Sequence, residues 1–148
     1  MYVDLQWQGP RIFSENRTPE TVPNYSGVYL ISSRKGLYSY PNGKSALAYI
    51  GSSMDVGSRL NQHVDESKRI VAQLREEGTL RFWWARVGYG SHDCVEQVLF
   101  DEFEEWHGKA PFLNQIRPPC SRDHRKFVVR SWNIAFPYYF SSSAQFND

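Results

Sequence analysis

Four polar side chains have the types that phosphodiester hydrolysis needs: Tyr29, Tyr49, Arg59 and Glu96. This reaction requires a base that activates water, a cation near the developing charge and usually a divalent metal held by a carboxylate. The guanidinium of Arg59 is a planar cation that fits phosphate oxygens. A lone inward carboxylate such as Glu96 suits one Mg²⁺ or Mn²⁺ that keeps several waters. A tyrosine base needs a nearby cation or metal-bound water, because the ordinary pKa of a phenol is about 10.

Two more polar residues join this candidate catalytic set, and two glycines flank it. His63 follows Arg59 at i+4, so both side chains leave one face of a helix and the imidazole is a candidate proton relay. The amide of Asn114 is expected to orient the active-site loop or a phosphate. Gly27 and Gly51 are expected to be structural, because they give strand ends room for a close approach of backbone or substrate.

Short runs of β-branched and aromatic residues predict the strands that carry the tyrosines. These runs are residues 25–32, 37–40 and 46–51. Pro41-Asn42-Gly43 predicts a tight turn between the last two runs, since proline presets one dihedral angle and Asn-Gly tolerates positive φ. We therefore expect an antiparallel meander with Tyr29 and Tyr49 on its outer strands.

Apolar residues at helical spacing predict two helices that carry the arginine and the glutamate. The first helix begins after Asp55, which can cap its N-terminus, and runs to Gly78. A strand over 80–87, buried on both faces, separates it from a second helix over about 93–106. The predicted buried stripe of the second helix is Val95, Val98, Leu99, Phe103 and Trp106.

These elements predict an α+β fold. Short strands are also expected over 127–129 and 132–140. The predicted architecture is a small, mostly antiparallel sheet of about three core strands plus an inserted hairpin strand, flanked by helices.

The order of the candidate residues resembles that of the GIY-YIG nuclease superfamily. The matching elements are Gly27-Val28-Tyr29, Tyr49-Ile50-Gly51, Arg59, Glu96 and Asn114. Each triplet is short, but five elements in the right order on the right kinds of secondary structure form a specific combination. The resemblance implies a GIY-YIG-like fold and a Mg²⁺- or Mn²⁺-dependent endonuclease acting on DNA. It also implies that the two tyrosines flank the active site, with either one as the base.

The resemblance also divides the chain. Residues 25–117 correspond to the nuclease domain, residues 1–24 to an N-terminal arm, and residues 118–148 to a C-terminal extension packed on the same domain. The stretch between the two triplets is longer than in the smallest members. It resembles the longer hairpins of the restriction-enzyme branch.

Total charge does not point to a partner, but its distribution does. The chain has 17 basic and 16 acidic residues, for a formal net charge of +1. Between residues 117 and 130, bases interleaved with aromatic residues favour contact with a phosphate backbone. These bases are Arg117, Arg122, Arg125, Lys126 and Arg130. The alternative is a charged surface loop that leads into an edge strand.

Two alternatives to the proposed metal site remain open. Acids on the second predicted helix compete with Glu96, namely Asp101, Glu102, Glu104 and Glu105. The second alternative is a zinc site made of His92, Cys94, Cys120 and His124, although their spacing is not that of a common ribbon or finger. Because the chain has two cysteines, too few for a disulfide-stapled scaffold, we expect free thiols.

Composition narrows the class of protein. With 41% hydrophobic and 16% aromatic residues, intrinsic disorder is excluded. No long apolar run or signal-peptide pattern occurs, so we expect a soluble cytoplasmic protein with no membrane partner. DNA is the expected partner. The alternative functions are a non-catalytic nucleic-acid-binding module on the same fold and an RNA-directed nuclease. Cutting both strands of a duplex would require a dimer or sequential nicks.

Overall fold

The structure is a computed structural model that describes residues 1–12, 22–33, 37–64, 80–111, 113–114 and 124–132. The helices in these residues are α1 (Val56–Val64), α3 (His92–His107) and the 3₁₀ helix η1 (His124–Lys126). The strands are β1 (Tyr2–Gln6), β2 (Gln8–Ile12), β3 (Gly27–Ser33), β4 (Tyr38–Tyr40), β5 (Gly43–Ser45), β6 (Leu47–Ser53), β7 (Leu80–Arg86) and β8 (Val128–Trp132).

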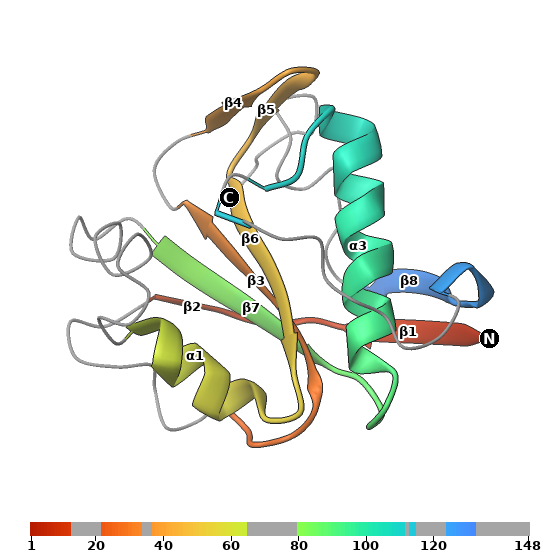
Figure 1. Ribbon diagram of the computed structural model, residues 1–148. Helices are drawn as coiled ribbons and strands as arrows, with labels where there is room; N and C mark the ends of the chain where they lie inside the picture. Colours follow the sequence, from red (N-terminus) through yellow and green to blue (C-terminus); the bar gives the residue numbers. More distant parts are fainter. Residues whose placement is uncertain (13–21, 34–36, 65–79, 112, 115–123, 133–148) are drawn as a thin grey trace.

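An antiparallel sheet in the order β2-β7-β3-β6 forms the centre of the molecule (Figure 1). The α+β class with a mostly antiparallel sheet is thus confirmed. The predicted meander is wrong, because β3 pairs directly with β6, whereas β4 and β5 pair with each other in a separate sheet. Tyr29 therefore lies on an inner strand, opposite Gly51 on one side and Trp84 on the other. Tyr49 lies on β6, an edge strand of this sheet.

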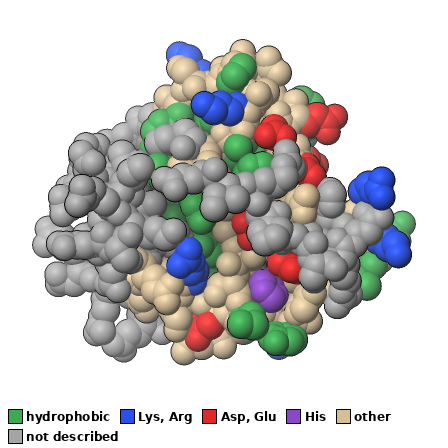
Figure 2. Space-filling view, in the orientation of Figure 1, with side chains coloured by type: hydrophobic (Ala, Val, Ile, Leu, Met, Phe, Trp, Pro, Cys, Tyr) green, Lys and Arg blue, Asp and Glu red, His purple; other side chains and the backbone are tan. Residues whose placement is uncertain are grey.

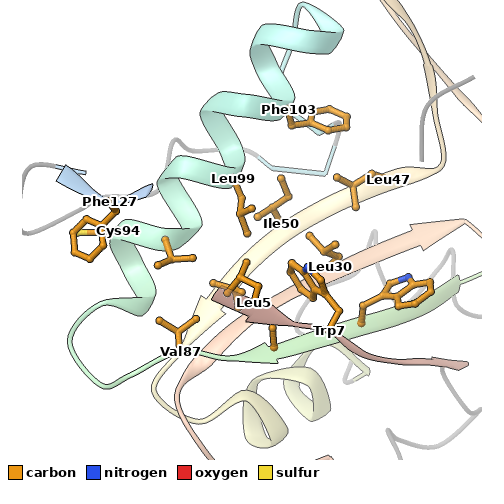
Figure 3. Close-up of a cluster of buried hydrophobic side chains, with 14 of the residues drawn as sticks. Leu5, Trp7, Leu30, Leu47, Ile50, Val87, Cys94, Leu99, Phe103 and Phe127 are labelled. Carbon is orange, nitrogen blue, oxygen red and sulfur yellow. The ribbon is translucent and has the colours of Figure 1, made fainter. Parts of the chain in front are cut away.

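The two faces of the sheet bury separate hydrophobic clusters, because successive strand residues point to opposite faces. On one face α3 packs against the sheet, and Figure 3 shows Leu99 pointing toward Ile50 of β6. On the other face Leu60 of α1 packs in the cluster that contains Tyr29. The predicted burial of β7 on both faces is confirmed by Phe82, Trp83, Trp84 and Ala85.

The inserted hairpin has the predicted turn. Tyr40 of β4 pairs with Gly43 of β5, which leaves Pro41 and Asn42 as a two-residue connection. The Tyr40 hydroxyl donates to the Leu47 carbonyl at 2.8 Å. The hairpin is thereby attached to the first residue of β6, the strand that carries Tyr49.

Residues within the predicted N-terminal arm form strands that the sequence analysis did not predict. β2 pairs with β7 and becomes the edge of the central sheet opposite β6. β1 pairs in parallel with β8, from the predicted C-terminal extension. Leu5 and Trp7 are buried in the same core cluster as α3. The strand predicted over 132–140 lies outside the described residues beyond Trp132.

The two α-helices begin where predicted. The Asp55 carboxylate accepts a hydrogen bond from the Ser58 backbone N–H at 3.0 Å, which caps α1. The predicted continuation of this helix to Gly78 lies outside the described residues. In α3, Trp106 is exposed and not buried as predicted, whereas His107 beside it is buried. Among the described residues, no helix has the length and apolar character that crossing a membrane requires.

Candidate active site

The ring of Tyr29 lies against the backbone of the neighbouring strand. A Cβ atom placed on Gly51 would be 2.3 Å from Cζ of Tyr29 and 2.4 Å from its hydroxyl oxygen. Any larger residue at position 51 would therefore displace the phenol. Gly27 has an equally tight environment, since a Cβ there would be 2.2 Å from the Ala85 carbonyl oxygen. Both glycines occupy positions of close approach, in agreement with the structural role expected for them.

Tyr49 and Arg59 surround the same phenol. The rings of Tyr29 and Tyr49 stack with centroids 6.0 Å apart and an interplanar angle of 17°. Arg59, half-buried on α1, donates side-chain hydrogen bonds to both tyrosines. Its Nη1 also donates to the Gln62 side-chain oxygen at 2.8 Å. One guanidinium is thus held between two phenols and a helix-surface amide.

The two phenols differ in exposure. Tyr29 is only 1% exposed, whereas Tyr49 is half-buried. Burial raises the pKa of Tyr29 well above its ordinary value, Tyr49 raises it further, and Arg59 opposes both effects. Burial also raises the pKa of Tyr49, with a contribution from Glu96, while Arg59 and the hydrogen bond with Tyr29 lower it. Both phenols are therefore protonated at neutral pH in the unliganded protein, and only Tyr49 has surface for an incoming group.

Glu96 approaches from the other face of the sheet. It lies on α3, and the Ser52 hydroxyl of β6 donates to its carboxylate at 2.5 Å. Burial raises the pKa of Glu96 to about 7; Asp93 contributes to the increase, and Ser52 and Arg59 oppose it. Because Ser52 and Tyr49 point to opposite faces of β6, the four predicted residues surround this edge strand from both sides. Figure 1 shows β6 running between α1 and α3.

Asn114 holds β6 by its backbone. Its side-chain nitrogen donates to the Ile50 carbonyl at 2.9 Å, and its oxygen accepts from the Ile50 N–H at 3.1 Å. The amide thus makes the two hydrogen bonds that a neighbouring strand would make, at the residue between Tyr49 and Gly51. Of the two roles predicted for Asn114, the structure favours orientation of the site over contact with a phosphate, because both polar atoms of the amide are used.

The donor set around Glu96 fits a hard divalent cation. A single carboxylate with a hydroxyl beside it is a usual protein contribution to a Mg²⁺ site that takes its other ligands from water and phosphate. Among the described residues, no group of three or more His, Cys, Asp or Glu side chains is arranged to hold a metal. Of the competing acids on α3, Glu102 has a raised pKa because of burial and the nearby Glu105. Glu96 accepts a hydrogen bond from the Ser52 hydroxyl of β6.

The free-thiol prediction is wrong for Cys94, which is disulfide-bonded. A disulfide sulfur is not a thiolate, so Cys94 in this state is not available as a zinc ligand. Cys120 and the side chain of His124 lie outside the described residues. The structure therefore gives no support to the alternative zinc site.

The remaining predicted residues either lie outside what the structure describes or belong to η1 and β8. His63 belongs to α1, but its side chain lies outside what the structure describes, as do Arg117 and Arg122. Arg125 and Lys126 are exposed on η1. Arg130 is bound to Asp4 on the opposite strand of the β1–β8 pair. The described part of the basic segment is therefore close to β1 rather than part of the tyrosine cluster.

Sequence analysis missed Ser52 and Asp93, which both act on Glu96. Ser52 directly follows the Tyr49-Ile50-Gly51 triplet, and strand alternation would have placed it on the face that receives α3. Asp93 lies three residues before Glu96, a spacing that brings side chains together on a helix. Both residues thus had a local signal, but the pairing of β6 with α3 was needed to interpret it.

Comparison with known proteins finds no relative: no protein-family profile, no curated protein and no solved structure matches this chain.

Proposed function

We propose that this protein is a metal-dependent endonuclease that hydrolyses DNA phosphodiester bonds at the edge strand β6. The observation that carries the proposal is the position of Arg59, which binds both tyrosines and lies near enough to Glu96 to lower its pKa. This arrangement combines a phosphate-binding cation, two proton-transfer groups and a carboxylate ligand at one place. The resemblance to the GIY-YIG nuclease superfamily supports the same function.

Each residue has a role that follows from its surroundings. Glu96, oriented by Ser52, would hold Mg²⁺ or Mn²⁺. When bound, the cation supplies positive charge that favours deprotonation of water and neutralises charge on the phosphate. Arg59 would supply the planar cation that binds non-bridging phosphate oxygens. Tyr49 is the better candidate for the base, because Tyr29 is fully buried beneath it.

The direct test is cleavage of supercoiled plasmid and single-stranded DNA with Mg²⁺ or Mn²⁺. We expect nicking that a chelator abolishes and that Glu96→Gln removes. Glu105→Gln, which changes an exposed acid of the same helix, is the matched control and should retain activity. Full activity of Glu96→Gln would contradict the metal assignment. No cleavage by wild-type protein with either metal on either substrate would contradict the proposed function.

One observation favours the alternative of a non-catalytic nucleic-acid-binding module. Burial raises the pKa of both phenols above the ordinary value of a tyrosine, which opposes the use of either one as a base. This alternative predicts salt-dependent DNA binding without cleavage under any of the above conditions. An RNA substrate of the same sequence, assayed in parallel, separates a DNA-directed from an RNA-directed nuclease.

A further inference from the structure

The parallel β1–β8 pair has one face on the core and one on the surface. Asp4 pairs with Arg130, and Gln6 with Trp132. Leu5 is buried in the core cluster, against which Val129 also packs. Because strand residues alternate between faces, the outward residues form a continuous surface. We call this surface the β1–β8 outer face; it consists of Tyr2, Asp4, Gln6, Val128, Arg130 and Trp132.

Hydrogen bonds and ring contacts organise this face in the absence of any ligand. Arg130 Nε donates to Asp4 Oδ1 at 2.8 Å. The guanidinium carbon of Arg130 lies 5.0 Å from the ring centroid of Tyr2 and 5.8 Å from that of Trp132. The indole N–H of Trp132 also donates to the Asp4 carboxylate, and these hydrogen bonds lower the pKa of Asp4. The two rings are therefore held at defined positions on either side of one arginine.

Both rings remain open to solvent. The exposed fraction is 69% for Tyr2 and 47% for Trp132, and Val128 is also exposed. Large apolar side chains gathered on a protein surface mark a site of interaction. A surface of this kind is available to a flat ligand that can cover a ring.

The surroundings of the outer face are positively charged. Arg125 and Lys126 are exposed on η1, next to the start of β8. Arg125, Lys126 and Arg130 thus place three basic side chains at this end of the described chain, with Asp4 bound to Arg130. Figure 2 shows Lys and Arg side chains beside hydrophobic ones at this end of the molecule, on the right of the view. This charge is complementary to phosphate.

We propose that the β1–β8 outer face binds single-stranded nucleic acid, with bases stacked on Tyr2 and Trp132 and phosphates bound by Arg125 and Lys126. Exposed aromatic rings beside cations are the combination by which proteins bind unpaired strands without sequence preference. A duplex would offer its phosphates but not its base faces, so the rings select unpaired nucleotides. The proposal rests on the proposed function only for the class of ligand, since this face is separate from the tyrosine cluster.

The test is fluorescence anisotropy of a labelled oligothymidylate, longer than the roughly 4–16 nucleotides that such sites cover, with full-length protein in chelator. We expect Tyr2→Ala and Trp132→Ala each to weaken binding by about 5- to 150-fold. Trp106→Ala is the matched control, because Trp106 is 46% exposed on α3, close to the 47% of Trp132. It should bind as wild type does. Lys126→Glu, a surface change that spares the rings, should weaken binding and reduce its salt dependence.

Several outcomes would overturn the proposal. Wild-type affinity in a folded Tyr2→Ala, Trp132→Ala double variant is one, and equal loss in Trp106→Ala is another. Tighter binding to a duplex of the same length would exclude stacking. A protein dimer that the double variant abolishes and the oligonucleotide does not dissociate would assign the face to a second copy of the chain.

The same assays separate this proposal from the nuclease proposal. Binding that requires the two rings, in a protein that cleaves nothing, would support the outer face and contradict the proposed nuclease. Cleavage that Glu96→Gln abolishes, with strand binding unaffected by the double variant, would support the nuclease proposal and contradict the proposal for the outer face.

Discussion

At two places in the described part of this protein, an arginine lies between two aromatic side chains. At β6, half-buried Arg59 donates hydrogen bonds to the hydroxyls of Tyr29 and Tyr49. On the β1–β8 outer face, exposed Arg130 faces the rings of Tyr2 and Trp132. Burial makes the first group a site of strongly shifted pKa values, because charge is costly where solvent is excluded. Exposure leaves the second group as a surface for stacking.

The largest expected effect is on the chemical step and comes from the buried arginine. Arg59→Ala should lower kcat by about 10²- to 10³-fold, the usual loss when one preorganised donor to a transition-state charge is removed. Single-turnover cleavage of labelled DNA measures it. Arg11→Ala, an exposed arginine on β2, is the control and should leave kcat unchanged. If Trp132→Ala lowered kcat as much as Arg59→Ala, the distinction between the two regions would be wrong.

A smaller effect, on stability, follows from the close approach at Gly51. Gly51→Ala should destabilise the protein by about 1–3 kcal/mol, because the new Cβ would overlap the Tyr29 ring. Urea unfolding measures the loss. Truncating the ring in the double variant Gly51→Ala, Tyr29→Ala removes the clash, so the two substitutions should be less destabilising together than the sum of their separate effects. Strict additivity would mean that the glycine does not accommodate the phenol.

The raised pKa of Glu96 predicts a stability that falls as pH rises, the opposite sign to the effect of Asp4 on the outer face, whose pKa is lowered. The pKa of Glu96 is about 7 in the folded protein and ordinarily 4.5. The protonated carboxyl therefore favours the folded state, and this contribution to stability is fully present below the unfolded pKa. That stabilisation is lost as pH rises through 7. Glu96→Gln cannot ionise, so its melting temperature relative to wild type should increase between about pH 5 and pH 8.5.

Two controls accompany this measurement. Gln97→Ala, a change on the same helix that removes no ionisable group, should show a constant difference from wild type across the same range. Mg²⁺ at high pH should stabilise wild type but not Glu96→Gln, because a ligand that binds only the folded state raises its stability. A difference in melting temperature between Glu96→Gln and wild type that does not change with pH would contradict the raised pKa of Glu96.

The features that could be predicted are those that depend on residues close together in the sequence. Asp55 caps α1 and the Pro41-Asn42-Gly43 turn closes a hairpin, as their neighbours in sequence indicate. Long-range pairings had no such signal. The Asn114 amide binds the backbone of Ile50, 64 residues away, and nothing near Asn114 in the sequence indicates that partner.

The β1–β8 pair illustrates the same limit. Asp4 and Arg130 are 126 residues apart, and each alone is an ordinary surface charge. In the sequence, Arg130 belongs with its basic neighbours, because charge clustering is visible along the chain. Its partners on β1 follow only from the pairing of the two ends of the described chain.

The smallest expected effect concerns the stability of the outer face. Trp132→Ala should change the free energy of unfolding by at most about 1 kcal/mol, because its cation–π contact with Arg130 and its hydrogen bond to Asp4 are both exposed to solvent. The same substitution should weaken oligonucleotide binding strongly. Gly51→Ala should have the opposite pair of effects: a larger loss of stability and little direct effect on strand binding. Measured side by side, the two variants test whether the buried cluster and the exposed face are independent, and a large stability loss in Trp132→Ala would show that they are not.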